Sequence, residues 1–446
     1  MSENHHLVAV VGAGPAGLFA ARQLANHGVQ VVLFNRDIKP GGLAEYGIYH
    51  DKVKMKEGLR KQFRQILELP KISYYGHVEV GENGDISLAE LRQMGFHAIL
   101  VTVGAQGTKW LGLPGEDLVG VYHAKDLVYH YNKLPPYSLQ SYSIGKRVAL
   151  VGVGNVMMDI AHWLVHDLKV AEAVGVARRG PAEVKFTKKE LEYVGANLDM
   201  QAFEAELKRV EPVMEAIGQD AAAAREFIFS GASKALPAAS LTRLRFDFLA
   251  SPVRILGDSQ GRVCGLEVEN TALSGSSEDP KARGLGTFRV IEVDTVVFCI
   301  GDKVDEGFGL PVKWNAYVKS PSPCFPVNGL SYEAYDPGVG QPIRGVFVAG
   351  WSREASSGLV GVARKDGEIG ALAVLQYLHQ QVGHSRPEDV LARLEQCLKS
   401  LYKPVIHQDD IKKLEAAEHA EALKVGKEQF KFASNAEMLA AIGVEG

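Results

Sequence analysis

The chain has 446 residues, which is too long for one ordinary hydrophobic core and predicts two or three domains. Hydrophobic residues make up 46% and charged residues 23%, as in globular proteins, and a net charge of -4 gives no bulk basicity that would indicate nucleic-acid binding. No run of about 18 apolar residues predicts a membrane span. With only six residues before the apolar run at Leu7, we expect no targeting peptide and a cytoplasmic chain.

The four cysteines are scattered along the chain, at Cys264, Cys299, Cys324 and Cys397. No CxxC pair is present, which argues against a redox-active dithiol. Iron–sulfur and zinc sites need clustered thiolates, so no metal is predicted. We expect four buried thiols that have a structural role.

The first predicted unit is a complete βαβ motif. Residues 7–11 form a short apolar run that predicts a buried parallel strand, residues 18–25 have helical spacing, and residues 29–34 predict a second strand. A GxGxxG motif joins the first strand to the helix, with glycines that permit a tight turn, close approach to a pyrophosphate and close helix–strand packing. The predicted dinucleotide contacts are Gly12, Gly14, Pro15, Ala16 and Gly17.

Three further positions extend this first site. Asn35 ends the second strand, where an acid normally binds the ribose hydroxyls; an asparagine can still bond the ribose, without charge assistance. Gly42 and Leu43 lie in a glycine-rich stretch, residues 40–48, that we interpret as a flavin contact, with a ligand-free turn as the alternative. Gly104 follows residues 102–103 at the end of another predicted strand.

The same pattern returns about 140 residues later. Residues 147–151 and 173–177 predict strands around a helix at 159–168, and the turn between them presents Gly152, Val153, Gly154, Asn155 and Val156 to a second dinucleotide. Arg178 and Arg179 follow the second strand, where NAD sites prefer an acid. Paired arginines suit a 2′-phosphate, so NADP is favoured over NAD, with a solvated basic turn as the alternative. Glu190 is expected near the same ribose.

The remaining segments are predicted more coarsely. Residues 202–240 indicate surface helices, residues 271–288 an exposed hairpin loop, and residues 296–300 and 345–350 apolar strands. A helix is expected over residues 361–380. Residues 384–446 are predicted to be mainly helical, with a break at Pro404.

Taken in order, these motifs resemble the adrenodoxin reductase and bacterial ferredoxin–NADP+ reductase family, which are glutathione-reductase-like flavoproteins with two dinucleotide-binding domains. The small subunit of glutamate synthase is similar, more distantly. The segments that carry the resemblance are 12–17, 41–48, 75–80, 113–116, 152–159, 178–187, Gly350-Trp351 and a C-terminal tail that includes 431–433 and 437–441.

The resemblance implies an α/β fold with two Rossmann-like domains, the NADP domain being inserted in the FAD domain. The implied boundaries are 1–106 and 303–383 for the two halves of the FAD domain, 107–302 for the NADP domain and 384–446 for a helical extension. It also implies FAD contacts at Ala16, Asn35, Leu43, Val80, Gly350, Trp351, Gly358, Leu359 and Val360. Implied NADP contacts are residues 153–156, Arg178, Arg179, Glu190 and Gly358, and Trp351 and Gly358 are the flavin-side candidates for a catalytic role.

The activity implied is transfer of a hydride from NADPH to FAD and of electrons onward to, or from, a ferredoxin-like iron–sulfur protein. A flavoprotein subunit of the glutamate synthase type is the alternative, although its N-terminal cysteine cluster is absent. A flavin monooxygenase is disfavoured because its FxGxxxHxxx motif is missing between the two glycine motifs. A redox-sensing binding module is the non-enzymatic alternative.

The sequence also departs from the family pattern. Family members usually read Gly-Trp-x-Lys-Arg-Gly-Pro-Thr-Gly-Val-Ile, whereas residues 350–360 here lack that charge pattern. The arginine-rich helix that docks an acidic ferredoxin in adrenodoxin reductase is replaced by residues 220–227, which contain one arginine. Six cations, Lys52, Lys54, Lys56, Arg60, Lys61 and Arg64, indicate a solvated helix face or a replacement docking surface. His50, in the turn after residue 48, is a flavin-side candidate.

Overall fold

The computed structural model describes residues 6–355, 358–381 and 386–444. The chain divides into two compact units. Unit 1 comprises the chain up to Thr108, Tyr129–Leu139 and the chain from Asp302 onward, and unit 2 comprises Lys109–Val128 and Gln140–Gly301. The two ends of the chain therefore build one unit, and most of unit 2 is a single inserted segment.

Unit 1 is built on a six-stranded sheet in the order β17-β18-β4-β1-β2-β3. Its strands are parallel except for β17, which pairs with β18 in antiparallel fashion. Because the parallel strands end at one edge, the segments that follow β1, β2, β4 and β18 meet there. The strands are β1 (Leu7–Val11), β2 (Gln30–Asn35), β3 (Ile72–Gly76), β4 (Ala98–Val101), β17 (Glu333–Asp336) and β18 (Gln341–Val348).

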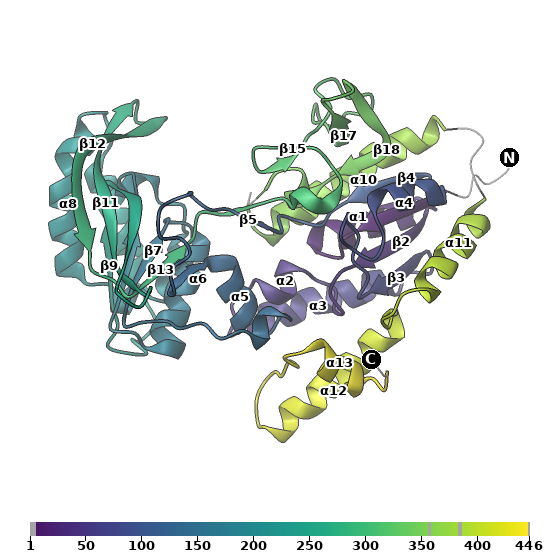
Figure 1. The fold of residues 1–446 in the computed structure, drawn as a ribbon, viewed down its shortest axis with the longest axis horizontal. Coiled ribbons are helices and arrows are strands. Elements are labelled where there is room, and N and C mark those ends of the chain that lie inside the picture. The colour runs from purple at the N-terminus through teal and green to yellow at the C-terminus, as the bar shows by residue number, and fades with distance from the viewer. Residues whose placement is uncertain (1–5, 356–357, 382–385, 445–446) are drawn as a thin grey trace. The chain divides into compact units, whose positions relative to one another are not determined.

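Helices cover both faces of this sheet, as Figure 1 shows. Alternate residues of the central strand face opposite ways: Val8 and Val10 pack with α1, α3, α10, α12 and α13, whereas Leu7, Ala9 and Val11 pack with α4 and α11. The helices are α1 (Pro15–Asn26), α2 (Leu43–Tyr46), α3 (Val53–Leu67), α4 (Leu88–Met94), α10 (Val360–His379), α11 (Pro387–Lys399), α12 (Gln408–Lys424) and α13 (Asn435–Ala441). Four short strands, β5 (Gly107–Thr108), β14 (Asp302–Lys303), β15 (Val312–Lys313) and β16 (Ala316–Tyr317), complete unit 1.

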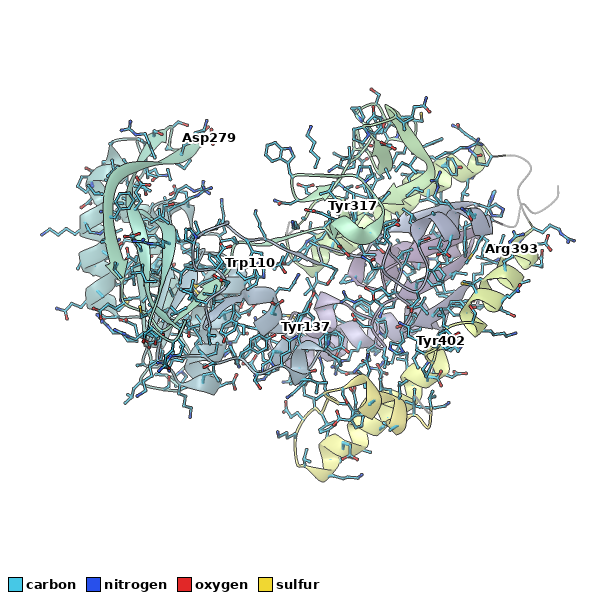
Figure 2. The ribbon with its side chains drawn as sticks, in the orientation of Figure 1. Trp110, Tyr137, Asp279, Tyr317, Arg393 and Tyr402 are labelled. Carbon is cyan, nitrogen blue, oxygen red and sulfur yellow. The ribbon has the colours of Figure 1, made fainter. Side chains whose placement is uncertain are left out.

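The C-terminal helices pack on unit 1. The predicted break at Pro404 is confirmed, because α11 ends at Lys399 and α12 begins at Gln408. Arg393 of α11, labelled in Figure 2, donates twice to the Met94 carbonyl oxygen at the end of α4, at 2.8 and 3.1 Å. The side chains of Ile411 and Leu414 on α12 join the same core as α1 and α10. This extension is therefore an integral layer of unit 1.

Unit 2 repeats the α/β architecture. Its five-stranded parallel sheet has the order β6-β13-β7-β8-β9. The strands are β6 (Val121–His123), β7 (Arg147–Val151), β8 (Glu172–Val176), β9 (Arg243–Asp247) and β13 (Thr295–Phe298). The helices are α5 (Ala124–Tyr131), which runs into the 129–139 segment of unit 1, α6 (Asn155–Trp163) with a π-helical turn at Leu164–Leu168, α7 (Lys188–Glu192), α8 (Met200–Glu215) and α9 (Ala221–Ala232).

An antiparallel sheet covers one face of the parallel sheet in unit 2. It consists of β10 (Ala250–Gly257), β11 (Val263–Gly275) and β12 (Pro280–Ile291). Leu266 and Val268 of β11 pack into one core with Val174 and Val296 of the parallel sheet. The predicted hairpin loop over residues 271–288 is therefore wrong in extent: most of it is strand, and Asp279 lies at the turn (Figure 2). Polar residues on the outer face of β12 obscured the strand pattern.

The predicted fold class is confirmed, since each unit contains a mainly parallel sheet built from βαβ motifs with a glycine-rich turn. Within the described residues, no helix is long and apolar enough to cross a membrane.

Candidate functional site

The first glycine motif forms a tight turn between β1 and α1. Gly12 has φ +105°, and a Cβ there would lie 2.6 Å from the Thr102 carbonyl oxygen. A Cβ on Gly17 would lie 1.9 Å from the Gly12 carbonyl oxygen, so helix and strand approach as closely as the motif predicts. By contrast, a Cβ on Gly14 would meet nothing within 4 Å. Open space thus lies in front of the first turn of α1, whose N–H groups have no intrahelical partner.

Asn35 holds the neighbouring loop in shape. Its side chain is buried; Oδ1 accepts from the Ala13 N–H at 3.2 Å, and Nδ2 donates to the carbonyl oxygens of Asp37 and Lys39 at 2.7 and 2.9 Å. An aspartate has no side-chain N–H group and would not donate to these two carbonyl oxygens. The amide at this position therefore has a local structural reason that sequence reasoning missed.

The glycine-rich stretch after β2 returns to the first motif. The Gly41 N–H donates to the Ala13 carbonyl oxygen at 2.7 Å, and a Cβ on Gly42, which has φ +49°, would lie 3.2 Å from Gly14 Cα. α2 begins at the next residue, Leu43. The structure thus brings Gly12–Gly17, Asn35 and Gly42–Leu43 to one place at the carboxyl edge of the sheet.

Gly104 and Gly350 reach the same edge from β4 and β18. The Gly104 N–H donates to Ser352 Oγ at 3.0 Å, and the Gly350 N–H donates to Asp366 Oδ2 at 2.6 Å. Asp366 also forms an ion pair with Arg353 at 2.7 Å, with both side chains largely buried. The carboxylate of Asp366 therefore links Gly350, at the end of β18, to α10.

The start of α10 is exposed and apolar. Gly358 has φ +70° and is exposed, Leu359 is 60% exposed and Val362 is 52% exposed. Exposed aliphatic side chains at a helix N-terminus fit a site that a planar ligand would cover. Trp351 is half-buried in the turn at Gly350–Ser352. Ser356 and Ser357 of the predicted motif lie outside the described residues.

Val80 lies apart from the turn at Gly12–Gly17 in the chain. It follows β3 and pairs with Ile86, and its side chain is 8% exposed in the core that includes Phe34. Its assignment as an FAD contact stays a prediction, as do the other individual contacts.

The second glycine motif repeats the first turn with a difference. Gly152 has φ +114°, and a Cβ there would lie 2.5 Å from the Cys299 carbonyl oxygen, while a Cβ on Gly154 would meet nothing within 4 Å. A fully buried Met157 occupies the position of the third glycine. Asn155 Oδ1 accepts from the Thr187 N–H at 2.9 Å, which connects the turn to the start of α7.

Arg178 and Arg179 follow β8 with their backbones fixed and their guanidinium groups available. Their carbonyl oxygens accept from Thr271 Oγ1 at 2.7 Å and from the Leu249 N–H at 3.2 Å. Arg178 is exposed, Arg179 is half-buried, and among the residues that the structure describes no carboxylate pairs with either. Glu190 lies in α7, where its backbone N–H donates to Oγ1 of the N-cap residue Thr187 at 3.3 Å.

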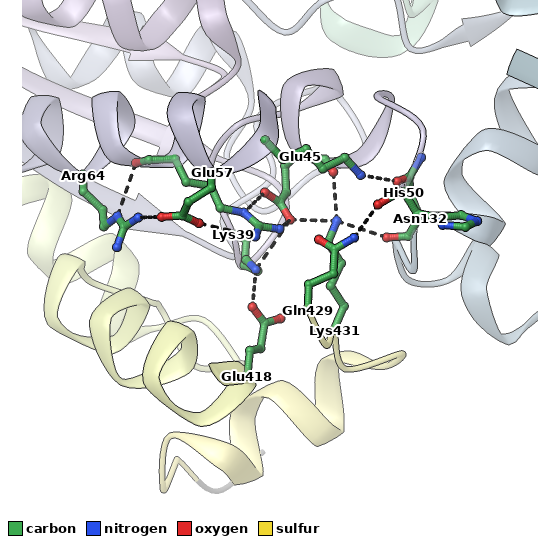
Figure 3. A network of polar contacts seen from close by, with 11 residues as sticks. Lys39, Glu45, His50, Glu57, Arg64, Asn132, Glu418, Gln429 and Lys431 are labelled. Atoms are coloured by element: carbon green, nitrogen blue, oxygen red, sulfur yellow. Dashed lines mark hydrogen bonds and ion pairs between the residues drawn. The ribbon is translucent and has the colours of Figure 1, made fainter. Parts of the chain in front are cut away.

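A buried charge cluster, which sequence reasoning missed, surrounds α2 (Figure 3). Glu45 accepts both N–H groups of Arg60, at 2.6 and 2.7 Å, and forms ion pairs with Lys431 at 2.7 Å and Lys39 at 3.6 Å. Glu418 of α12 bonds the Lys39 ammonium from below. Burial alone would raise the pKa of Glu45, but Lys39, Lys431 and Arg60 together hold it well below its usual value. We call Lys39, Glu45, Arg60, Glu418 and Lys431 the Glu45 cluster.

Two expectations about the basic stretch are corrected. Lys56 does not lie on a solvated face or docking surface: it is 1% exposed and donates to Asn132 Oδ1 at 2.6 Å. Arg60 is not on a solvated face either, because its guanidinium donates to Glu45.

The flavin-side candidate His50 stacks on Tyr49 with ring centroids 4.4 Å apart, and its carbonyl oxygen accepts from Gln429 Nε2.

The cysteine expectation is also corrected. Cys299 is buried, but Cys264 and Cys324 are exposed and Cys397 is half-buried, so the thiols are not uniformly core residues. In the part of the chain that the structure describes, no group of three or more His, Cys, Asp or Glu side chains could hold a metal ion.

Comparisons with known proteins agree with these features. Residues 6–198 match the family model described as pyridine nucleotide-disulphide oxidoreductase. The chain is 27% identical to a mitochondrial NADPH:adrenodoxin oxidoreductase of Salvelinus fontinalis, over 97% of this chain and 90% of that protein. It is 28% identical to the NADPH-ferredoxin reductase FprA of Mycobacterium tuberculosis, over 97% of this chain and 98% of that protein.

Solved structures give the same answer for the fold. The structure of Mycobacterium tuberculosis FprA in complex with NADPH superposes with a TM-score of 0.81 at 26% identity, covering 98% of this chain and all of that one. The resemblance that the motifs indicated is therefore confirmed over nearly the whole chain.

Proposed function

We propose that this chain, a member of the adrenodoxin reductase and bacterial ferredoxin–NADP+ reductase family, is an FAD-dependent, NADPH-oxidising reductase that passes electrons to a ferredoxin-like iron–sulfur protein. The observation that supports this most is the pair of glycine turns, Gly12–Gly17 and Gly152–Asn155, each open in front of a helix N-terminus. The similarity to NADPH-dependent reductases extends over nearly the whole chain. We therefore expect the two turns to bind the two cofactors of one reaction.

FAD is assigned to unit 1. The open space at Gly14 would take the pyrophosphate, Gly42 and Leu43 would lie against the flavin, and the exposed start of α10 at Gly358–Val360 would cover its ring. N–H groups at the start of α10 favour negative charge on a neighbouring ring. The bound flavin supplies the redox chemistry, accepting electrons in pairs and releasing them singly.

NADPH is assigned to unit 2. The guanidinium groups of Arg178 and Arg179 have no carboxylate partner among the described residues and lie where a 2′-phosphate is expected. Bidentate contacts to such a phosphate favour NADPH over NADH. We keep the predicted boundaries, 1–106, 107–302, 303–383 and 384–446, as the working division between FAD domain, NADP domain and extension.

The acceptor is proposed by chemical class. The relatives are named as reductases of adrenodoxin and ferredoxin, both iron–sulfur proteins, and that class is carried over here. The alternative, a subunit of the glutamate synthase type, is not favoured, because the first cysteine of this chain is Cys264 and an N-terminal cysteine cluster is absent. We propose the cytoplasm as location; some relatives are named as mitochondrial.

Rapid mixing tests the proposal. The purified yellow protein is mixed anaerobically with NADPH, and separately with NADH, while the flavin absorbance band is followed. Fast bleaching by NADPH with much slower bleaching by NADH supports the assignment, and equal rates would contradict the role of the arginine pair. A colourless protein, or no bleaching by either nucleotide, would contradict the oxidoreductase itself.

A second measurement addresses the acceptor. Cytochrome c reduction by NADPH is followed with and without an added [2Fe–2S] ferredoxin. A rate that depends on ferredoxin supports the acceptor class, whereas bleaching without ferredoxin-dependent reduction would point to another acceptor and leave the flavin chemistry intact.

A further inference from the structure

A cavity of about 440 Å3 lies in unit 1 beside the Glu45 cluster. Three segments far apart in the sequence line it: the turn and helix start at 50–56, the end of α5 at 131–133, and the strap before α13 at 427–431. No residue of either glycine turn lines it, and of the residues predicted to lie beside a cofactor only the flavin-side candidate His50 borders it. The cavity is therefore a separate site from the two glycine turns.

Lys56 is the most unusual residue of this lining. Its side chain is almost completely buried, and within the described chain its amine has a single partner, the neutral Asn132 Oδ1 at 2.6 Å. No described carboxylate lies within ion-pairing distance of it. A buried lysine that lacks a counterion and borders a cavity has hydrogen-bonding capacity that a bound anion would use.

Gln429 adds the complementary group. Its Nε2 donates to the His50 carbonyl oxygen, while its Oε1 is buried and has no partner in the described structure. An acceptor without a donor is as costly to bury as a donor without an acceptor. The cavity thus presents an unused donor, on Lys56, and an unused acceptor, on Gln429.

The rest of the lining determines the character of a ligand. Lys133 and Lys427 are exposed at the rim, and Lys431 is already engaged by Glu45. Asp51 and Glu428 also border the cavity, so the rim carries charges of both signs. Tyr131 and Phe430 supply aromatic surface.

We propose that this cavity binds a small ligand with a phosphate or carboxylate group, which accepts a hydrogen bond from Lys56 while a protonated oxygen or nitrogen of the ligand donates to Gln429. Tyr131 and Phe430 favour a ligand with a planar ring next to that group. The proposal does not depend on the redox activity, because binding is measured without NADPH or an electron acceptor.

Proton uptake is a specific consequence. Burial, and next the nearby Lys431, lower the pKa of Lys56 to about 6; Arg60 and Lys39 act in the same direction, and Glu45 opposes them. At pH 7 the empty site therefore holds mainly the neutral amine. An anion favours the ammonium form, so binding takes up a proton and weakens as the pH rises above about 6.

Calorimetry on the protein as purified, with its flavin, tests the proposal. 4-Hydroxyphenyl phosphate, inorganic phosphate and 4-hydroxybenzoate are titrated separately at pH 7, in two buffers with different enthalpies of ionisation; the phenolic hydroxyl of the aromatic probes supplies the donor for Gln429. We expect saturable binding of 4-hydroxyphenyl phosphate or 4-hydroxybenzoate, tighter than that of inorganic phosphate, with proton uptake visible as a difference between the buffers. The better of the two aromatic anions identifies the ligand as a phosphate or a carboxylate.

Variants separate the site from general charge effects. Lys56→Met is expected to weaken binding by about tenfold or more and to abolish proton uptake, since a charge-assisted bond is lost. Lys54→Met removes an exposed cation from the same helix and should change neither. If Lys56→Met does not fold, Gln429→Glu places a carboxylate at the acceptor position and should exclude the anion. Binding unchanged in Lys56→Met or Gln429→Glu, or no saturable binding of any probe below about 10 mM, would overturn the proposal.

Discussion

The two glycine turns have the same local geometry but different surroundings. In unit 1 the residue that ends the second strand, Asn35, is buried and bonded to three backbone groups. In unit 2 the corresponding strand is followed by Arg178 and Arg179, whose guanidinium groups have no carboxylate partner among the described residues. The turn of unit 1 is also backed by α10 and neighboured by the Glu45 cluster.

This difference matches two kinds of ligand. A preformed, internally bonded site loses little conformational entropy on binding and suits a cofactor that stays. Arginines that have no carboxylate partner in the described chain remain free to bind a ligand, which suits a nucleotide that binds and leaves in every cycle. Four variants test this contrast.

Gly17→Ala should damage the braced turn most. The new Cβ would lie 1.9 Å from the Gly12 carbonyl oxygen, and the backbone must shift to relieve the overlap. We expect a loss of more than about 4 kcal/mol in unfolding free energy, or no flavin-bound protein. Urea unfolding and the ratio of flavin to protein absorbance measure this. Gly58→Ala in α3, where a Cβ meets nothing within 4 Å, should be neutral or stabilising, and a similar loss there would point to general intolerance.

Glu45→Gln should destabilise unit 1 by about 3 kcal/mol at pH 7, because Lys39, Arg60 and Lys431 lose their shared buried counterion. The folded-state pKa of Glu45 lies below its ordinary value of 4.5, so its stabilisation is present above about pH 4.5 and fades as the pH falls further. The gap between wild type and variant in urea unfolding should therefore narrow in acid. Glu57→Gln, which affects an exposed pair with Arg64, serves as the control and should cost less than about 1 kcal/mol. A gap that stays constant down to pH 3 would show that the charge of Glu45 does not stabilise the fold.

The double substitution Arg178→Leu with Arg179→Leu should lower kcat/KM for NADPH by about 100-fold, equivalent to losing one or two charge-assisted phosphate contacts. The kcat/KM for NADH should stay within about twofold of its wild-type value, because NADH has no 2′-phosphate. Steady-state flavin reduction assays measure both. Lys208→Gln removes an exposed cation from α8 of the same unit and should leave the NADPH preference intact. Equal losses with both nucleotides would indicate damage to the fold rather than to phosphate recognition.

Asn35→Asp introduces the acid expected at the end of the second strand of a dinucleotide-binding unit, yet it should destabilise this chain by about 2 kcal/mol. The carboxylate would face the carbonyl oxygens of Asp37 and Lys39, which now receive hydrogen bonds. Urea unfolding is compared with Asn83→Asp, an exposed site where no change is expected. Tighter FAD binding without a loss of stability would show that ribose recognition dominates at this position.

Sequence reasoning worked best where a local pattern has one structural meaning. The turn at Gly12–Gly17 and the strand before it follow from spacing alone, because few residues other than glycine tolerate φ near +105° or a neighbour at 1.9 Å. Gly152 is predictable for the same reason, and the break near Pro404 follows from the inability of proline to continue a helix.

It failed where the outcome depends on distant partners. By their spacing, Lys56 and Arg60 fit one solvated face of a helix. In the structure Lys56 donates to Asn132 and Arg60 to Glu45, so both side chains point toward the protein interior. Lys431 meets the Glu45 carbonyl oxygen across 386 residues, a pairing that no local pattern reveals. The charged residue Glu45 inside a glycine-rich stretch was the one available hint, since a carboxylate there is buried only with cations.

The packing of α1 on α10 has a consequence for how the protein is made. A Cβ on Gly367 would lie 2.1 Å from the Ala16 carbonyl oxygen, so the first nucleotide turn is backed by a helix from the other end of the chain. On the ribosome, residues 7–108 must therefore wait for the chain beyond Asp302, while most of unit 2 is already complete and can fold. We expect the flavin to be captured only after α10 has been synthesised, when this late helix can reach the early turn.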